Sequence, residues 1–322
     1  MILLVALLVA DVYLVRQTAD VVQLVDTARD TTVSIVTARG NVVSEMRVKG
    51  HDIIMWPNGG IPLLAPWANR LDEQAFYANG KRYAFDMELG NVRGVTPIHG
   101  LLQRADQWEI VEVKADASSA WVTSRLDFAK QSGWMKQWPF AHRIEITHVL
   151  RDGTLEVRTI ITNDSTEPMP IAIGFHPYFQ VTDAPRDDWT ISVGARTQWL
   201  LAANKVPTGE TRPITQLFPD PHSTTLKDYA LDDVFSDLER DRDGRATMTV
   251  RGKSQRIDVV FGPNYKAAVV FAPSGRNFIC FEPMAGITNA LNMAHRGVYK
   301  ELQTLASGKT WEETFWIKPS GF

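Results

Sequence analysis

The spacing of apolar residues is the feature that most constrains how this chain can fold. Many segments alternate apolar and polar side chains with a period of two, or are runs of β-branched residues, and both patterns are typical of β-strands. In residues 154–162, Leu155 and Val157 share one face while Glu156 lies on the other. Long helical periodicity is missing, and short helices are predicted only near residues 224–229 and 298–302. The chain is therefore predicted to be all-β.

The expected strands follow one another with short turns between them, as in a large antiparallel β-sandwich. No repeat of fixed period and no Gly/Ser-rich or Pro-rich linker divides the chain. We predict one sandwich domain over residues 20–322, preceded by an apolar extension over residues 1–19. The predicted strands cover residues 32–37, 41–48, 109–113, 120–128, 142–150, 154–162, 246–250, 255–261 and 267–271.

The composition argues against several classes of function. With 34 Lys and Arg against 37 Asp and Glu, the formal net charge is −3 and no basic cluster stands out, so we expect no nucleic-acid partner. The single cysteine, Cys280, excludes a disulfide framework and a multi-cysteine zinc site. His142 and His148 should share one face of a predicted strand, but their spacing and neighbours do not favour a metal. No metal site is expected.

The first 15 residues are consistent with more than one cellular compartment. Residues 1–10 are all apolar, but Asp11 interrupts the run, so that about 15 residues fall short of the roughly 20 that a membrane span requires. No basic residue precedes the run, as it would in a secretory signal, although residues 8–10 weakly match a cleavage site. We favour a first strand or packed extension in a cytoplasmic protein. A trimmed signal peptide within residues 1–15 would instead indicate a periplasmic or secreted one.

Four segments differ from the strands around them. Each places one ionisable side chain in an apolar setting stiffened by glycine or proline, which desolvates the side chain and tunes its acid–base behaviour. Taken singly, His176 is also consistent with a core histidine, Glu282 with a carboxylate at a strand end, and Arg70 with a structural ion pair. The four side chains are Arg70, His99, His176 and Glu282, in residues 59–71, 96–102, 174–179 and 281–286.

Together these segments resemble the aldose 1-epimerase (galactose mutarotase) family. The similar motifs are Pro-x-x-Asn-Arg at residues 66–70, Ile-His-Gly at 98–100, Gly-Phe-His-Pro-Tyr-Phe at 174–179 and Glu-Pro-Met at 282–284. They occur in the order and spacing of that family, and the resemblance covers roughly residues 20–318. It implies a galactose mutarotase-like supersandwich, with an open cleft for a small-molecule sugar on one sheet. We expect a monomer or a homodimer.

The resemblance also implies a mechanism without a cofactor. The α and β anomers of an aldose interconvert through the open-chain aldehyde, which needs a base at the C1 hydroxyl and an acid at the ring oxygen, with no electron or group transfer. By resemblance Glu282 is the base, His176 is the acid, and His99 is a second polar anchor beside the ring oxygen and the C1 hydroxyl. A Glu and His pair suits this chemistry, because the carboxyl ionises readily and the imidazole titrates near neutrality.

Three further residues belong to the implied substrate-binding set. Arg70 would hydrogen-bond sugar hydroxyls through its planar fork. The acidic residue of the family lies in a Leu-Asp-His-x-Phe segment, which residues 231–235 match best, with Asp232 as the acid and Asp233 in place of the histidine. Which of the two aspartates contacts the sugar stays open. Asn69 is expected to act through side-chain hydrogen bonds to its loop backbone.

The sequence thus predicts an aldose 1-epimerase acting on neutral aldohexoses, and three other functions remain open. A hexose-6-phosphate 1-epimerase is one, because residues 59–62 resemble that branch, but it would require additional Arg or Lys around the cleft. A carbohydrate-binding sandwich would have no need of an acid and base pair. A glycoside hydrolase would require two carboxylates flanking the bond, for which Glu282 and Asp232 are the candidates. The aromatic residues that could stack on a sugar, or belong to the core, are Trp108, Trp121, Trp134 and Trp138.

Overall fold

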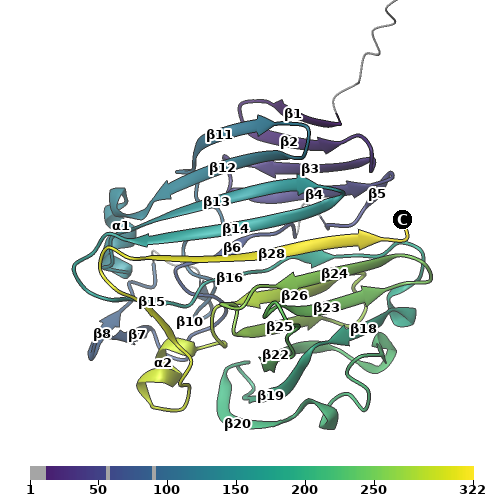
Figure 1. Ribbon diagram of the computed structural model, residues 1–322. Coiled ribbons are helices and arrows are strands. Elements are labelled where there is room, and N and C mark those ends of the chain that lie inside the picture. Colours follow the sequence, from purple (N-terminus) through teal and green to yellow (C-terminus); the bar gives the residue numbers. More distant parts are fainter. Residues whose placement is uncertain (1–11, 56–58, 89–91) are drawn as a thin grey trace, which may run out of the picture.

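The computed structural model describes residues 12–55, 59–88 and 92–322, and three antiparallel sheets dominate it (Figure 1). One sheet contains five described strands in chain order, each hydrogen-bonded to the next. This order requires only hairpin connections, which the short polar turns between the strands supply. Its strands are β1 (Tyr13–Gln17), β2 (Val21–Asp26), β3 (Thr31–Val36), β4 (Val42–Val48) and β5 (His51–Asp52).

The largest sheet runs across the molecule and has nine strands in the described part of the chain (Figure 1). Its central strand β28 comes from the end of the chain and pairs with β14 on one side and β24 on the other. In spatial order the strands are β11 (Glu109–Ala115), β12 (Ala120–Asp127), β13 (His142–Arg151), β14 (Thr154–Asn163), β28 (Thr310–Ser320), β24 (Arg256–Phe261), β23 (Ala246–Arg251), β18 (Thr190–Val193) and β21 (Thr224–Thr225).

The third sheet positions the candidate site and has eight described strands. In spatial order they are β20 (Pro207–Pro213), β19 (Ala195–Leu201), β22 (Leu231–Leu238), β25 (Ala267–Ala272), β26 (Ile279–Met284), β16 (Gly174–Phe175) and β6 (Leu63–Leu64), with β17 (Tyr178–Phe179) also paired to β26. Three two-stranded ribbons complete the described sheets: β7 (Ala75–Ala78) with β8 (Lys81–Ala84), β9 (Val92–Arg93) with β10 (Thr96–Pro97), and β15 (Met169–Ile171) with β27 (Gln303–Leu305).

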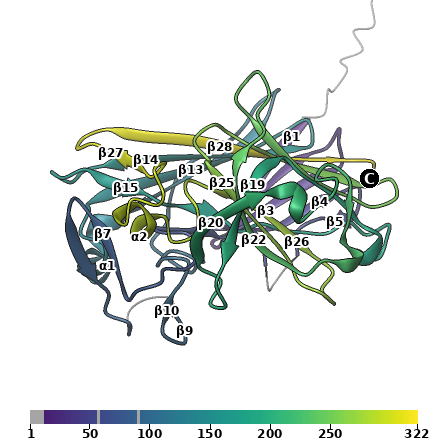
Figure 2. The ribbon, with the colours of Figure 1, turned by 90° about the horizontal axis from the view of Figure 1, so that it is seen from below.

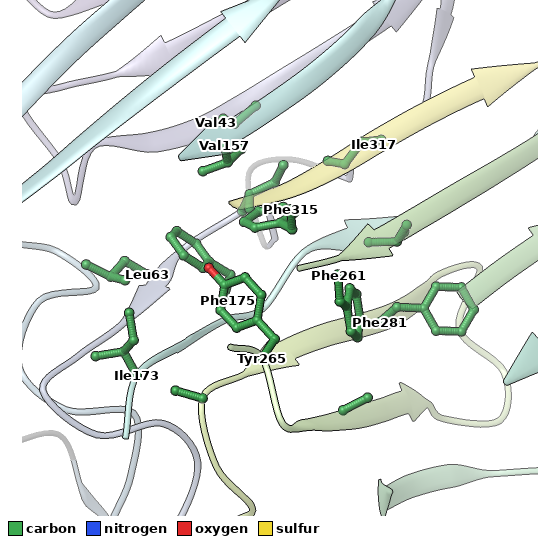
Figure 3. Packing of buried hydrophobic residues seen from close by; sticks show 14 of the residues in the cluster. Val43, Leu63, Val157, Ile173, Phe175, Phe261, Tyr265, Phe281, Phe315 and Ile317 are labelled. Carbon is green, nitrogen blue, oxygen red and sulfur yellow. The ribbon is translucent and has the colours of Figure 1, made fainter. Parts of the chain in front are cut away.

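The main core lies between the sheets and takes side chains from all three of them. Figure 3 shows Val43 of β4, Val157 of β14, Phe315 of β28 and Phe281 of β26 within it. Phe281 is fully buried here. Because successive residues of a strand point to opposite faces, Glu282 must point to the other face of its sheet.

A second apolar cluster covers that other face. It joins Val234 of β22, Val269 of β25 and Met284 of β26 to Met293 of the short helix α2 (Ala290–His295). The face that carries Glu282 is therefore partly closed by helix α2, and Glu282 lies in an apolar surrounding rather than on a solvent-exposed sheet.

The predicted strands are confirmed, with boundaries that shift by a residue or two, and the short helices are the main errors. Residues 224–229 contain β21 and a 3-10 turn over Leu226–Asp228. Residues 298–302 are not helical; the helix lies earlier, at α2, and α1 (Ser132–Gln137) was not predicted. Helix α2 ends because Gly297 adopts φ 74° and Val298 N–H bonds back to the Met293 carbonyl, a glycine-based termination that the periodicity of residues 298–302 does not reveal.

Only part of the predicted N-terminal extension lies within the described residues. Strand β1 lies inside the segment predicted as an extension, pairs with β2, and is held by Tyr13, whose hydroxyl accepts a hydrogen bond from Asp152 N–H at 3.0 Å. The apolar run of residues 1–10 and most of the signal-peptide segment lie outside the described residues. None of the described helices has the length and apolar character needed to span a bilayer. The domain limits stay predictions.

Candidate active site

Glu282 and Asp232 lie on one face of the eight-stranded sheet, two strands apart. Glu282 of β26 pairs with Val269 of β25, and Val269 pairs with Val234 of β22. Asp232 is two residues from Val234 and therefore shares its face. Glu282 is only 1% exposed, whereas the side chain of Asp232 is partly exposed. The register thus directs a buried and a more accessible carboxylate to the same side.

A close approach of two strands brings His176 to Glu282. Gly174 of β16 pairs with Met284 of β26, and a Cβ on Gly174 would lie 2.5 Å from the Met284 sulfur, so that glycine permits this spacing. Just beyond β16, the His176 backbone N–H donates to the Pro62 carbonyl at 3.1 Å. The His176 Nε2 atom lies 3.2 Å from Glu282 Oε1. The predicted acid and the predicted base are therefore in direct contact.

Two loops with left-handed backbone place His99 beside this pair. Asn69 and His99 have φ values of 55° and 63°, and the His99 N–H donates to the Asn69 carbonyl at 2.9 Å. Gly100 packs so closely on the Ala65 carbonyl that a Cβ would lie 2.0 Å from its oxygen. The His99 ring lies 5.5 Å from the His176 ring, edge to face. The conformations that asparagine and glycine adopt most readily thus explain part of both motifs.

Arg70 and Asp232 form the more accessible part of the site. Arg70 Nη2 lies 3.6 Å from Asp232 Oδ2, and Arg70 Nη1 donates to Asn69 Oδ1 at 3.0 Å. The sequence predicted that the Asn69 side chain would hydrogen-bond its loop backbone, but in the structure this side chain contacts Arg70 instead. The difference arises because the backbone carbonyl of Asn69 already accepts from His99, which ties the loops without the side chain.

The structure separates the two candidate aspartates. Asp232 lies next to Arg70, whereas Asp233, the next residue of β22, faces the opposite way. The Asp233 carboxylate accepts a hydrogen bond from Gln198 Nε2 at 2.8 Å, and Gln198 in turn accepts one from Arg212 Nε at 2.7 Å. Asp233 is thus engaged in a network within the sheet, and Asp232 is the aspartate that the fold brings to Arg70.

Burial dominates the electrostatics of the catalytic candidates. Desolvation, reinforced by the negative charge of Asp232, raises the pKa of Glu282 well above its ordinary value, and the positive charge of Arg70 opposes this shift. Desolvation also lowers the pKa of His176 to about 3, and that of His99 well below its usual range. Burial thus disfavours the charged form of each group, the carboxylate of Glu282 and the imidazolium of His176, and the two side chains face each other at 3.2 Å.

Several polar atoms of the site are buried without a partner. Glu282 Oε2, His176 Nδ1 and His99 Nδ1 make no hydrogen bond to any described protein group. A buried polar atom without a partner is costly, so such a group calls for a ligand or a functional explanation. A bound polar molecule with several hydroxyl groups would supply what these atoms lack.

Aromatic rings that the sequence analysis missed surround His176. Tyr178 stacks on the His176 ring at 4.6 Å with an interplanar angle of 11°, and Phe271 meets it edge-on at 5.9 Å. Phe278 packs against both Tyr178 and Phe271. Tyr178 belongs to the same motif as His176, two residues later, so its place in the motif was the available signal. No signal in the sequence indicated Phe271, because strand pairing alone brings it to His176.

The tryptophans considered for sugar stacking lie elsewhere. Trp138 is fully buried and stacks on Phe76, and Trp134 packs on Phe128. Trp121 donates its ring N–H to Glu112 at the outer edge of the largest sheet, and Trp108 belongs to the main core. None of the four contacts a site residue in the described structure. Trp108, Trp134 and Trp138 fit the core interpretation, whereas Trp121 is only partly buried.

His142 and His148 share one face of β13, as predicted, and both are buried. His142 stacks on Phe128 at 4.3 Å, and its Nδ1 lies 2.7 Å from the Phe140 carbonyl oxygen. Within the ranges that the structure describes, no three His, Cys, Asp or Glu side chains gather as a metal-binding cluster.

Comparison with solved structures defines the class of fold as galactose mutarotase-like. A galactose mutarotase-like protein from Clostridium acetobutylicum has a TM-score of 0.84 at 20% identity, with 96% of this chain and 98% of that chain covered. Galactose 1-epimerase from Lactobacillus acidophilus has a TM-score of 0.73 at 14% identity, covering 96% and 98%. An aldose epimerase homologue from C. elegans has a TM-score of 0.71 at 16% identity, covering 91% and 96%.

The family follows from the sequence itself. The family model described as Aldose 1-epimerase matches residues 21–318, which is nearly the whole chain. The chain belongs to the aldose 1-epimerase family, as the resemblance of its motifs implied.

Proposed function

We propose that the protein is a mutarotase that interconverts the α and β anomers of neutral aldohexoses such as galactose or glucose. The observation that carries the proposal is the contact of 3.2 Å between His176 Nε2 and Glu282 Oε1, in a buried site that also holds Arg70 and Asp232. A carboxyl and an imidazole in contact can supply both a proton acceptor and a proton donor, and anomerisation requires one of each.

The reaction would proceed by two proton transfers at adjacent oxygens of the sugar. Glu282, as the carboxylate, takes the proton of the C1 hydroxyl while protonated His176 gives its proton to the ring oxygen. The C1–O5 bond breaks and a C1 carbonyl forms, with no net gain or loss of protons by the pair. Rotation about C1–C2 presents the other carbonyl face, and the reverse transfers close the ring to the other anomer.

Burial makes the two proton transfers depend on each other. Because desolvation raises the pKa of Glu282 and lowers that of His176, each charged form is disfavoured alone, and the carboxylate and imidazolium that the cycle uses stabilise each other when both form at 3.2 Å. The proton is therefore exchanged among Glu282, His176 and the sugar rather than with solvent. His99, whose low pKa keeps it neutral, is suited to hydrogen-bond the C1 hydroxyl or the ring oxygen without competing for the proton.

Arg70 and Asp232 would hold the sugar by its hydroxyl groups. The guanidinium offers donors in a planar fork, and the carboxylate accepts. Asn69 would fix Arg70 through their hydrogen bond of 3.0 Å. A purely carbohydrate-binding protein gains nothing from a desolvated acid and base pair, which favours the catalytic interpretation.

Polarimetry of freshly dissolved α-D-glucose and α-D-galactose tests the proposal. We expect mutarotation to be faster than in buffer alone, and Glu282→Gln and His176→Asn each to lower kcat by about 10²-fold or more, since each removes one proton-transfer partner. The matched control is His222→Asn, because His222 Nε2 lies 3.2 Å from Glu239 Oε2 in an exposed pair remote from the site.

The control should keep the rate of the unmodified protein. No acceleration with any of a panel of aldoses would disprove the proposed activity. A Glu282 or His176 variant that folds and retains near-normal turnover would remove that residue from the mechanism.

A further inference from the structure

Helix α2 links the segment that follows Glu282 to the segment that follows Arg70. The helix comes after Glu282 in the chain, and Figure 1 and Figure 2 both show it beside β7, the next strand after Arg70. Asn292 in the helix and Asn289 just before it are fully buried. Their side chains form hydrogen bonds to the stretch between Arg70 and β7. Two parts of the candidate site that are distant in the sequence are thus connected here.

Asp72 is the residue that both asparagines hold. Asn292 Nδ2 donates to Asp72 Oδ1 at 2.9 Å and to the Ala75 carbonyl at 3.1 Å. Asn289 Oδ1 accepts a hydrogen bond from the Asp72 backbone N–H at 3.3 Å. Arg296, which follows the helix, also contacts the Asp72 carboxylate. Asp72 is therefore fixed through its backbone and through its side chain.

The hydrogen bonds to Asp72 outweigh the effect of its partial burial. Burial by itself would raise the pKa of this carboxyl, but the hydrogen bonds from Arg296 and Asn292 lower the pKa below its ordinary value. Asp72 thus accepts these bonds as a carboxylate at neutral pH. Hydrogen bonds to a charged group are about twice as strong as those between neutral groups, so this connection is a firm one.

A neighbouring loop holds the other side of Arg70. Arg70 pairs with Ile98 in an isolated antiparallel bridge, and the Leu71 N–H donates to the Pro97 carbonyl at 3.1 Å. The backbone of Arg70 is thus held from two directions, by this loop and, through Asp72, by helix α2. These contacts set the direction in which the guanidinium leaves the chain.

The buried asparagines have a cost that packing alone does not explain. Asn292 Oδ1 and Asn289 Nδ2 are buried and make no hydrogen bond to any described protein group. Leu291 and Met293, the neighbours of Asn292, are buried apolar side chains. An apolar residue at position 292 would avoid the cost of an unpaired amide oxygen. Features that lower stability concentrate at functional sites, and the polar contacts here lead to Arg70.

We propose that Asn292 is a positioning residue, which through its hydrogen bond to Asp72 sets the place of Arg70 for the sugar. The inference rests on the proposed function and adds to its binding site a residue that does not touch the substrate. Arg70 would hold sugar hydroxyls both before and during ring opening, so its displacement should weaken the ground state and the transition state alike. Loss of Asn292 should therefore raise KM and leave kcat nearly unchanged.

Two measurements on the full chain test this role. Polarimetry gives kcat and KM for the aldose that is turned over best. Calorimetry gives the affinity for 1,5-anhydro-D-glucitol or 1,5-anhydro-D-galactitol, matched to that aldose, which lack the C1 hydroxyl and cannot open their rings. We expect Asn292→Ala to raise KM and to weaken binding of the analogue about three- to tenfold, with kcat changed by less than about twofold.

A second variant and a control separate positioning from loss of stability. Asn289→Gly removes the side-chain bond to Asp72 while glycine keeps the φ of 64°, so KM should rise again with the helix intact. The control is Asn163→Ala. Asn163 is also fully buried, and its Nδ2 donates to two carbonyls at 2.9 Å, but it contacts no site residue in the described structure. This variant should lose stability and keep its KM.

A double variant decides whether Asn292 acts through Arg70. In an Arg70→Met background, Asn292→Ala should cause no further rise in KM and no further loss of analogue affinity. Fold-changes that multiply in the double variant, a normal KM in Asn292→Ala, or an equal rise of KM in Asn163→Ala would overturn the positioning role. Analogue binding that depends on Asn292 and Arg70 in this way, without mutarotation of any aldose, would refute only the proposed activity. Absence of both binding and mutarotation would refute both proposals.

Discussion

At the scale of single residues, burial decides what the titratable groups of this chain can do. In the sequence, Glu282 precedes Pro283 and His176 precedes Pro177, each in an apolar segment stiffened by proline. In the fold both are buried, and desolvation drives their pKa values in opposite directions. The sequence motifs identified these residues through family resemblance, but nothing local reveals that their side chains touch.

His148 shows the same physics without a catalytic role. It is buried on β13, its Nδ1 atom has no partner among the described residues, and desolvation lowers its pKa to about 3. The unfolded chain has a histidine pKa of about 6.5. Above about pH 6.5, His148 is neutral in both the folded and the unfolded state, so its titration costs no stability. As the pH falls from about 6.5 to about 3, only the unfolded state takes up the proton, and the free energy of unfolding decreases.

We therefore expect His148→Leu to reduce the dependence of stability on pH in this window, by up to about 1.4 kcal/mol per pH unit. Denaturant unfolding of both proteins at several pH values between 4 and 7 would measure the two slopes. The exposed His222→Leu is the control and should change the slope much less. Parallel stability curves for His148→Leu and the unmodified chain would contradict the assignment.

At the scale of elements, the approach of β16 to β26 controls the geometry of the proposed catalytic pair. Gly174 faces the Met284 sulfur and the Pro283 carbonyl oxygen, at 2.5 Å and 2.9 Å from where its Cβ would lie. Any side chain there must push the strands apart, and His176 follows β16 directly. The spacing of these strands therefore sets the distance between His176 and Glu282.

Gly174→Ala is expected to lower the stability by about 1–3 kcal/mol, as other overpacked sites do, and to reduce kcat more than it changes KM. The matched control is Gly133→Ala in helix α1, where a Cβ meets nothing within 4 Å and the backbone is helical. That change should be neutral or slightly stabilising. Polarimetry and thermal unfolding of both variants test the expectation, and normal turnover in Gly174→Ala would show that the strand spacing is not limiting.

Among the secondary-structure elements, the strands were easier to predict from the sequence than the short helices. The strands β13 and β14 were predictable because alternation and the turn at Asp152 and Gly153 are local signals. Helix α2 was misplaced because its limits depend on Asn289, with φ 64°, and on Gly297, and residues 298–302 carry a similar periodicity without being helical. Short helices are determined by their ends and by tertiary packing more than by their own periodicity.

At the scale of the whole molecule, the class of fold was predictable but the order of the strands was not. Alternation over most of the chain indicates antiparallel sheets. It cannot show that β28 lies between β14 and β24, because pairing such as that of Leu155 with Ile317 depends on contacts between distant segments. The same limit applies to the site: Arg70 was assigned by its motif, whereas Phe271 follows no motif and meets His176 only in the fold.

Assembly of the site from distant segments has a consequence for the folding kinetics. His176 and Glu282 are 282 − 176 = 106 residues apart in the chain, and Arg70 and Asp232 are 232 − 70 = 162 apart. Hairpins such as β13–β14 close short loops, whereas these contacts close long ones, which is slow because more chain entropy is lost before any contact stabilises the structure.

On refolding from denaturant, far-UV circular dichroism should therefore recover well before catalysis. Stopped-flow dichroism and polarimetry on the same refolding sample would measure the two rates. If catalytic turnover recovered in the earliest kinetic phase of refolding, the contact between His176 and Glu282 would have to form before the sheets around it. With the expected delay, the anomerisation rate reports when the last long-range contacts of the polypeptide have closed, which makes catalysis itself a probe of the late stages of folding.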